Sequence, residues 1–133
     1  MIKKQAVPFG DAMGMEVAFC NAISVDMSTV KRQIWLSGQI AFDEQGDIVG
    51  KGDIAAQTEQ CVKNLQAALE KLDATLNDIV EVTVFVTDMT GLKHVHEVRL
   101  KYFDPPYPTS TLVKVSGFVH PDALIEIKAV AVV

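Results

Sequence analysis

Cysteine and long apolar runs are scarce in this sequence, and their scarcity argues against two broad classes of protein. The 133 residues include only two cysteines, Cys20 and Cys61, whereas small secreted domains held by disulfides carry larger, even sets. No stretch approaches the roughly 20 apolar residues of a membrane span, and residues 1–5 lack the apolar core of a signal peptide. We expect a cytoplasmic protein with no membrane partner and two reduced, half-buried thiols; a disulfide between them is the alternative.

Basic residues are also few. The chain has 12 Lys and Arg against 17 Asp and Glu, a formal net charge of -5, and its densest basic stretch is the pair Lys3-Lys4. An acidic chain repels phosphate backbones unless it gathers a basic patch. Nucleic acid is therefore not an expected partner.

Motifs for metals, phosphates and activated nucleophiles are missing as well. His94 and His96 are two residues apart and would lie on different faces of a helix, and His120 is far away in the sequence. No glycine-rich phosphate loop and no Gly-x-Ser-x-Gly turn is present. Ser37, His96 and Glu126 can be imagined as a triad, but nothing in their spacing supports one. We expect no metal or other cofactor.

The chain does have the composition of an ordinary folded domain. Hydrophobic residues make up 49% and charged residues 22%, which argues against wholesale disorder. No repeat, low-complexity tract or linker divides the chain. We therefore predict a single domain over residues 1–133, a length that suits one core.

Hydrophobic periodicity locates five strands. The segment Ile79–Val86, IVEVTVFV, gives the strongest signal because its valines alternate with other residues. The turn at residues 43–47, where Gly46 can take a positive φ, favours an antiparallel beginning of the sheet. The other predicted strands are residues 17–25, 33–38, 111–115 and 124–133.

Two helices are predicted between these strands. Asp53 can cap a helix that runs to about Leu72, with its apolar positions on one face and Gln57 largely elsewhere. A weaker helix follows over residues 89–103, where Asp104-Pro105-Pro106 ends it. The apolar positions of the first helix are Ile54, Cys61, Val62, Leu65, Ala68, Leu69 and Leu72.

The order β-β-β-α-β-α-β-β predicts an α+β fold of two layers, in which a mixed β-sheet carries two helices on one face. Residues 79–86 and 123–133 are apolar on both sides, and two helices can cover only one face of the sheet. The second face should therefore bury against copies of the same chain.

Four segments, in order, resemble the RidA family, also called YjgF or L-PSP. Residues 17–23, VAFCNAI, stand where the family has a stretch like Gly-Pro-Tyr-Ser-Gln-Ala. Ser37-Gly38-Gln39-Ile40 matches its Ser-Gly-Gln-Ile turn. Ile79–Val86 with Thr87-Asp88 matches a strand end of the family, and residues 125–131 match its Glu-Ile-Glu-Ala-x-Ala strand.

The resemblance implies a homotrimer of chorismate-mutase-like subunits with small-molecule pockets between them. It also implies the hydrolysis of enamines and imines made by pyridoxal-phosphate enzymes, which releases ammonia without a metal or cofactor. Glu126 falls at the glutamate that positions or activates the attacking water, a sensible general base. The alternative is an edge-strand glutamate that faces solvent or pairs with Lys128.

One departure from the family concerns the cation that holds the substrate carboxylate. The family's arginine position is occupied here by Ser110, whose hydroxyl donates one neutral hydrogen bond and supplies no charge. The usual substrate range is therefore in question. Arg99, one turn beyond His96, is a candidate replacement for the missing charge.

The other pocket positions follow from the resemblance. Phe19 replaces a tyrosine, Ser37 and the adjacent Gly38 match the family, His96 replaces an asparagine, and backbone near Leu112 shapes the pocket. For His96 the alternative is an ordinary exposed helix residue. Three functions stay open: an enamine or imine hydrolase, a non-catalytic trimer that binds a small metabolite, and an endoribonuclease-like protein.

Overall fold

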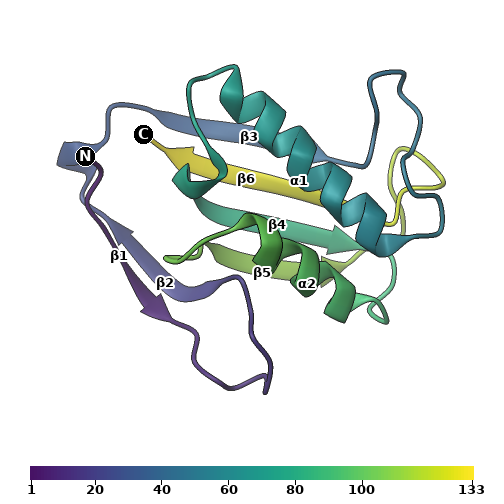
Figure 1. Ribbon diagram of the computed structural model, residues 1–133, viewed down its shortest axis with the longest axis horizontal. Coiled ribbons are helices and arrows are strands. Elements are labelled where there is room, and N and C mark those ends of the chain that lie inside the picture. Colours follow the sequence, from purple (N-terminus) through teal and green to yellow (C-terminus); the bar gives the residue numbers. More distant parts are fainter.

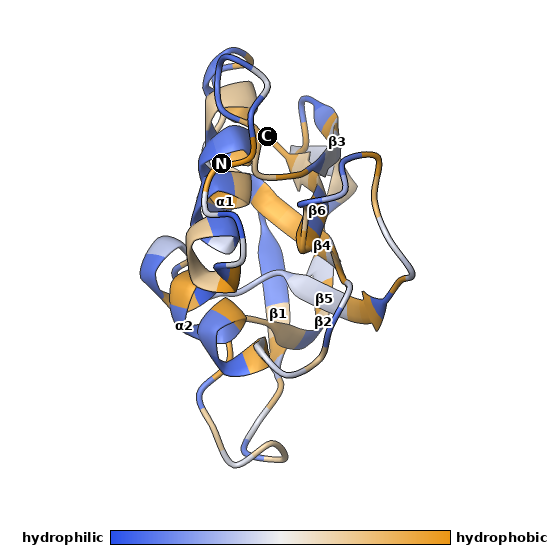
Figure 2. Ribbon diagram, turned by 90° about the vertical axis from the view of Figure 1, so that its right-hand side faces the viewer, coloured by the Kyte–Doolittle hydropathy of each residue, from blue (hydrophilic) through white to orange (hydrophobic).

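Six strands form one mixed sheet, and two helices lie on the same side of it (Figures 1 and 2). The computed structural model describes residues 1–133. The strands are β1 (Lys4–Pro8), β2 (Cys20–Val25), β3 (Gln33–Gln39), β4 (Ile79–Val86), β5 (Thr109–Lys114) and β6 (Ile125–Val132). The helices are α1 (Ile54–Glu70) and α2 (Leu92–Tyr102), with 3-10 turns at Met27–Thr29 and Leu76–Asp78. The predicted α+β class is confirmed.

The strand order is β1-β2-β5-β4-β6-β3. The pairs β2–β5 and β5–β4 are parallel, and β1–β2, β4–β6 and β6–β3 are antiparallel. The beginning of the chain is antiparallel because β1 pairs with β2, but β3 lies at the opposite edge. Since β6 lies between β4 and β3, Glu126 is not on an edge strand, contrary to one of the two interpretations above.

Helix α1 follows the predicted pattern with two corrections. Asp53 caps it, its side chain accepting from Ala56 N at 3.0 Å, and Cys61, Val62, Leu65 and Leu69 are fully buried. Leu72 lies beyond the helix and is 46% exposed. Gln57 was expected away from the core, yet it is completely buried, because its amide satisfies backbone groups of two loops.

Helix α2 begins three residues later than predicted. The Asp88 carboxylate accepts from Thr90 N at 2.7 Å, which favours a turn there, and Gly91 then caps the helix. His96 is buried at 4% exposure, so its interpretation as an exposed helix residue is wrong. Tyr102 Oη donates to Glu59 Oε1 at 2.6 Å and joins α2 to α1.

The first residues of several strands differ from the predicted ones. The predicted order contains one strand more than the five segments assigned to it, and the structure has a strand that the apolar pattern did not locate, β1. Strand β2 begins at Cys20 rather than residue 17, where Cys20 N donates to Pro108 O. Strand β5 begins at Thr109, two residues before the predicted start.

The face of the sheet opposite the helices is not covered by any element of the chain (Figure 2). It combines apolar and charged side chains, so it is less apolar than the sequence pattern predicted. Trp35, 71% exposed, and Val113, 39% exposed, are accessible apolar residues on it. Alternation along the strands assigns to this face Trp35, Thr83, Phe85, Val113, Glu126, Lys128 and Val130.

Both cysteines are buried and unpaired, so the disulfide alternative is wrong. None of the helices has the length and apolar character needed to cross a membrane.

Candidate functional site

A row of side chains crosses the helix-free face of the sheet at the level of Glu126. Ile125 and Ile127 point into the core, so Glu126 between them points to the opposite face. Its partner on β4 is Phe85, and the partner of Phe85 on β5 is Val113. On the other side, Gly38 of β3 touches the Glu126 side chain. We call Gly38, Phe85, Val113 and Glu126 the carboxylate row.

Gly38 leaves the space that the Glu126 carboxylate occupies. A Cβ atom at position 38 would lie 2.7 Å from Glu126 Cδ and 2.8 Å from Oε1, closer than real Cβ contacts. The chain is irregular here, with a register shift between Leu36 and Gln39. Ser37, next to Gly38, is exposed, and its carbonyl accepts from Gln39 Nε2 at 3.2 Å. The predicted residues Ser37, Gly38 and Glu126 therefore lie together.

The carboxylate of Glu126 is half-buried and has no partner within the chain. It forms no ion pair and no hydrogen bond, so the predicted alternative of a pair with Lys128 is not formed. Behind it, Cys61 Sγ lies 3.7 Å from Ile125 O. Burial, with a smaller contribution from the Glu126 charge, raises the pKa of Cys61 to about 12. The thiol is therefore protonated near neutral pH.

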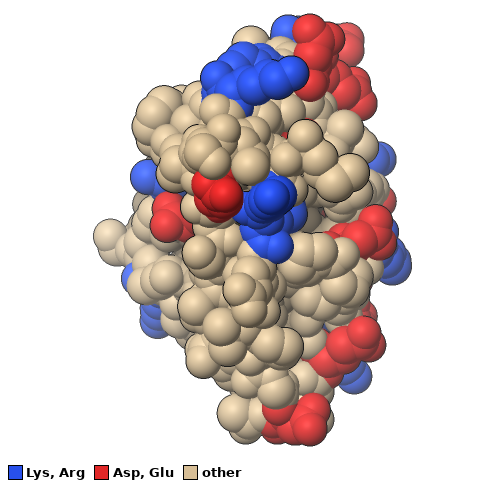
Figure 3. All heavy atoms as spheres, turned by 90° about the vertical axis from the view of Figure 1, so that its left-hand side faces the viewer, with Lys and Arg blue, Asp and Glu red and all other residues tan.

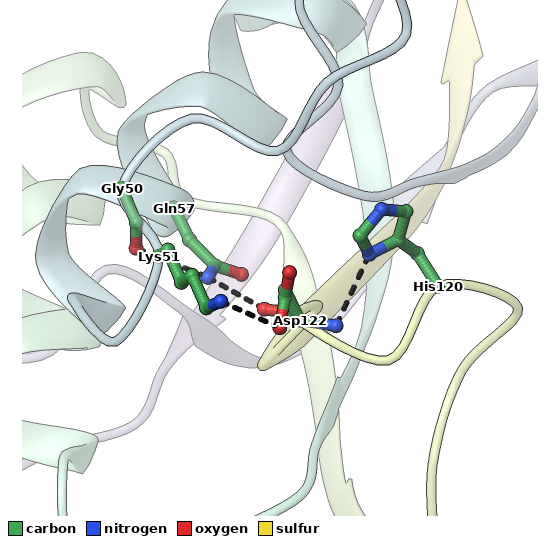
Figure 4. Close-up of polar contacts among 5 residues, drawn as sticks. All are labelled: Gly50, Lys51, Gln57, His120 and Asp122. Carbon is green, nitrogen blue, oxygen red and sulfur yellow. Dashed lines mark hydrogen bonds and ion pairs between the residues drawn. The ribbon is translucent and has the colours of Figure 1, made fainter.

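Gln57 fixes the point at which β6 begins, and with it the position of Glu126. Its Nε2 donates to Gly50 O at 3.1 Å and to Asp122 O at 3.0 Å, and its Oε1 accepts from Leu124 N at 2.8 Å. Figure 4 shows this amide between the loop before α1 and the loop before β6. The second loop is also held where Lys51 Nζ approaches Asp122 Oδ1 at 3.7 Å.

A second cluster lies on α2 and the segment before β2. The Phe19 and His96 rings are 6.1 Å apart, and Arg99 follows His96 by three residues on the same helix face. Arg99 is 2% exposed, and both Nη1 and Nη2 lack any hydrogen-bond partner, as does His96 Nδ1. We call Phe19, His96 and Arg99 the buried cation cluster.

Charge in this cluster is costly, because nothing in the chain neutralises it. Burial alone lowers the pKa of Arg99 to about 10. Burial, and then the Arg99 charge, lower the pKa of His96. The imidazole is therefore neutral near pH 7, while the guanidinium keeps its charge.

A cavity of about 940 Å³ adjoins the cluster at Phe19. The Phe9 ring packs against Phe19 at 4.7 Å and forms part of its wall. Asp11 and Glu16 are the acidic residues of its lining. The other lining residues are Ala6, Pro8, Gly10, Gly14, Met15, Val17, Cys20, Pro105, Pro106 and Tyr107.

Ser110 and Leu112 lie on the helix-facing side of β5. Their partners on β4 are Val82 and Val84, both buried in the core under the helices. Residues paired across neighbouring strands share a face, so Ser110 and Glu126 point to opposite sides of the sheet. The predicted site residues thus form two groups in one chain: Ser37, Gly38 and Glu126 on the open face, and Phe19, His96, Ser110 and Leu112 on the helix side.

Sequence reasoning missed two parts of this arrangement. Phe85 was seen only as a strand residue, although its place beside Glu126 depends on the pairing of β4 with β6. Arg99 was considered as a substitute cation, but its burial was not foreseen; its spacing of three residues from His96 is the available signal. No three His, Cys, Asp or Glu side chains converge in a way that could hold a metal ion.

Comparisons with a family model and with known proteins all point to the same family. A family model described as Endoribonuclease L-PSP matches residues 12–133. A RutC family protein of Pyrococcus abyssi is 42% identical over 99 residues, which are 74% of this chain and 76% of the relative. The 3-aminoacrylate deaminase RutC of Acinetobacter baylyi is 35% identical over 98 residues, with 74% of this chain covered.

Solved structures share the architecture. The Rid family protein YyfB of Yersinia pestis superposes with a TM-score of 0.82 over 98% of both chains at 24% identity, a likeness of fold alone. E. coli TdcF with bound serine superposes with a TM-score of 0.70 at 31% identity, covering 77% of this chain and 82% of TdcF. These likenesses confirm the two-layer arrangement predicted from the element order.

Proposed function

This chain belongs to the endoribonuclease L-PSP family, also called RidA or YjgF, and from that premise we propose that it hydrolyses small enamines or imines with Glu126 as the general base. The relative named 3-aminoacrylate deaminase acts on a molecule of this class, an amino group on a carbon–carbon double bond. Its 35% identity supports the reaction type and leaves the substrate of this chain open.

The observation that carries the proposal is the position of the Glu126 carboxylate. It is half-buried beside Phe85, seated in the space left by Gly38, and free of any ion pair. A carboxylate bound to a cation is a poor base, whereas an unpaired one beside an apolar wall can accept a proton from water. Gly38 and Gln57 hold it in place from two directions.

The reaction requires only water and proton transfers. An enamine first takes a proton from water on its carbon and loses one from its nitrogen, which gives the imine. Glu126 then accepts a proton from water while the water oxygen bonds to the imine carbon, and the carboxyl group passes that proton to the nitrogen, which returns Glu126 to its carboxylate form. The resulting carbinolamine gives its hydroxyl proton to the carboxylate, which protonates the nitrogen. The carbon–nitrogen bond breaks, and ammonia and a carbonyl compound leave.

We propose that the complete pocket forms between subunits of a homotrimer. Two features support this: the open face of the sheet exposes Trp35 and Val113, and the predicted site residues divide between the two faces of one chain. Packing the carboxylate row of one subunit against the Phe19 side of its neighbour would join them. Small molecules would then bind at three equivalent interfaces.

A binding protein without turnover is the second candidate. Ser110 supplies no charge where the family resemblance places an arginine, which favours altered or absent catalysis. The structural relative TdcF holds serine, so a small amino or oxo acid is a sensible ligand for this alternative.

An endoribonuclease-like function is the third candidate. We propose that the chain does not bind RNA. The chain has a net charge of -5, and on the face shown in Figure 3 the Lys and Arg side chains are separated by tan surface and interspersed with acidic ones. Phosphate binding needs gathered positive charge. Tight, salt-sensitive binding of a short RNA would overturn this.

Ammonia release tests the main proposal. We expect wild type to release ammonia from 3-aminoacrylate or 2-iminopropionate generated in the assay, and Glu126→Gln to lose activity about 100-fold or more, as general bases contribute this much. Glu44→Gln is the matched control, because Glu44 is an exposed carboxylate of the turn before α1. No ammonia from wild type, with saturable binding of the corresponding oxo acid, would establish the binding protein instead.

A further inference from the structure

Arg99 carries a buried charge that the chain leaves without a counterion. Its side chain is 2% exposed, and neither Nη1 nor Nη2 has a partner. Buried guanidinium groups are almost always paired, because a charge removed from water without compensation is strongly destabilising. Glu59, a carboxylate of the neighbouring helix α1, accepts instead from Tyr102 Oη, and Arg99 forms no ion pair within the chain. The unpaired state therefore indicates a missing anion.

The unpartnered atoms define which kind of anion fits. Both terminal nitrogens of one guanidinium are free, and these two together can donate in parallel to the two oxygens of a carboxylate. His96 Nδ1, one helical turn away, is a third unpartnered atom. A carboxylate that carries a neighbouring polar group would use all three.

A route to these atoms begins at the cavity of about 940 Å³. Phe19 lines that cavity, its ring lies 6.1 Å from the His96 ring, and the Arg99 charge acts on His96. The cavity has room for a small organic acid. Neither His96 nor Arg99 lines the cavity itself, so binding there requires the Phe19 ring to turn aside.

We propose that Arg99, with His96 beside it, binds the carboxylate of a small acid that enters through this cavity. Helix α2 then supplies the cation that β5 lacks at Ser110. The inference rests on the proposed function only in naming that acid as the substrate or product; the binding itself does not depend on catalysis. It gives a carboxylate ligand a cation in this chain despite the serine at position 110.

The test compares pyruvate with pyruvamide, its neutral analogue of similar shape, by calorimetry and thermal unfolding. We expect millimolar pyruvate to raise the melting temperature of wild type by about 2 °C or more, and pyruvamide to have no effect. Arg99→Met should abolish the pyruvate effect and melt no lower than wild type without ligand, because it removes an unpaired charge. Arg32→Met is the control at an exposed arginine; its response to pyruvate should equal that of wild type.

Three results would overturn the proposal. One is an equal response to pyruvate and pyruvamide. The second is a pyruvate effect that survives in Arg99→Met. The third is an Arg99→Met chain that fails to fold or melts well below wild type, because Arg99 would then be paired in solution. If Arg99 pairs with Asp11 or Glu16 of its own chain, the Asp11→Asn, Glu16→Gln double variant should melt below wild type. If it pairs with a neighbouring subunit, light scattering should show that Arg99→Met has a lower mass than wild type.

Failure here is distinguishable from failure of the proposed function. Glu126→Gln keeps the guanidinium of Arg99 and should therefore bind pyruvate at least as tightly as wild type, although its ammonia release is lost. Arg99→Lys keeps the charge but loses the planar fork, and should weaken pyruvate binding about tenfold or more. Ammonia release that is independent of Glu126 would refute the catalytic proposal and leave the anion site standing.

Discussion

The carboxylate of Glu126 fills the space that any side chain at Gly38 would occupy, with Cδ only 2.7 Å from where a Cβ would be. The side chain of Glu126 on β6 therefore occupies space beside β3 that is free only because residue 38 is glycine. In the proposed mechanism Gly38 is important because it has no side chain.

Gly38→Ala should therefore displace the carboxylate with little effect on the backbone, since Gly38 does not adopt a positive φ. We expect ammonia release to fall about 100-fold, the usual consequence of a misplacement near 1 Å, and the free energy of unfolding to fall by about 1–3 kcal/mol from crowding. Gly117→Ala is the control, because a Cβ there meets nothing within 4 Å. Equal activity in the two variants would show that the close approach has no functional role.

Gln57→Leu should destabilise the fold by about 2–4 kcal/mol. The leucine leaves Asp122 O and Leu124 N without their partner, while Gly50 O keeps its bond from Asp53 N, and unsatisfied polar groups are costly. Urea unfolding measures the loss, and Gln45→Leu, an exposed position, should change stability by less than about 0.5 kcal/mol. A small loss in Gln57→Leu would mean that water replaces the amide.

Cys61 should make the fold sensitive to alkali. Its pKa is raised from 9.0 to about 12 in the native state, so the unfolded thiol loses its proton first. Stability from this group is complete below pH 9 and falls by about 1.4 kcal/mol per pH unit up to the native value. Tyr102, whose pKa is raised to about 12, acts in the same direction, so the comparison of wild type with Cys61→Val isolates the thiol. Identical alkaline unfolding in both proteins would refute the prediction.

Trp35 reports on the open face of the sheet, because it is the one tryptophan of the chain and is 71% exposed in the isolated chain. In a trimer buried through this face, its fluorescence should be blue-shifted and shielded from acrylamide. Trp35→Asp should reduce the mass from about three chains to one, because a buried unpaired charge disrupts an apolar interface. Val119→Asp, at a 91% exposed loop residue, is the control. Water-like emission from wild type would place the interface elsewhere.

Sequence patterns predicted those elements whose stability is local. Ile79–Val86 was predicted with its observed bounds because alternation is a property of the strand itself, and Asp53 was recognised because a cap acts within one turn. The burial of Gln57 and His96 was not predictable in this way. Each depends on loops or helices distant in the chain, which tertiary contacts bring together.

The candidate site shows the same limit. The resemblance placed Glu126, Ser37 and Gly38 in one site, and the structure brings them together through the pairing of β3 with β6. It could not reveal that Ser110 points to the opposite face, since that depends on the register of β5 against β4. Nor could it reveal that Arg99 is buried without a partner.

The most direct test of the central claim, a hydrolytic pocket shared between subunits, is complementation between two inactive variants. Glu126→Gln removes the base on the open face, and Phe19→Asp disrupts the group of site residues on the helix side. Each variant should be folded, trimeric and inactive alone. After the two are unfolded, mixed in equal amounts and refolded together, about a quarter of the sites in random trimers should combine two intact halves, with matching recovery of ammonia release. A mixture no more active than either variant alone, or full activity in Phe19→Asp by itself, would contradict the shared pocket.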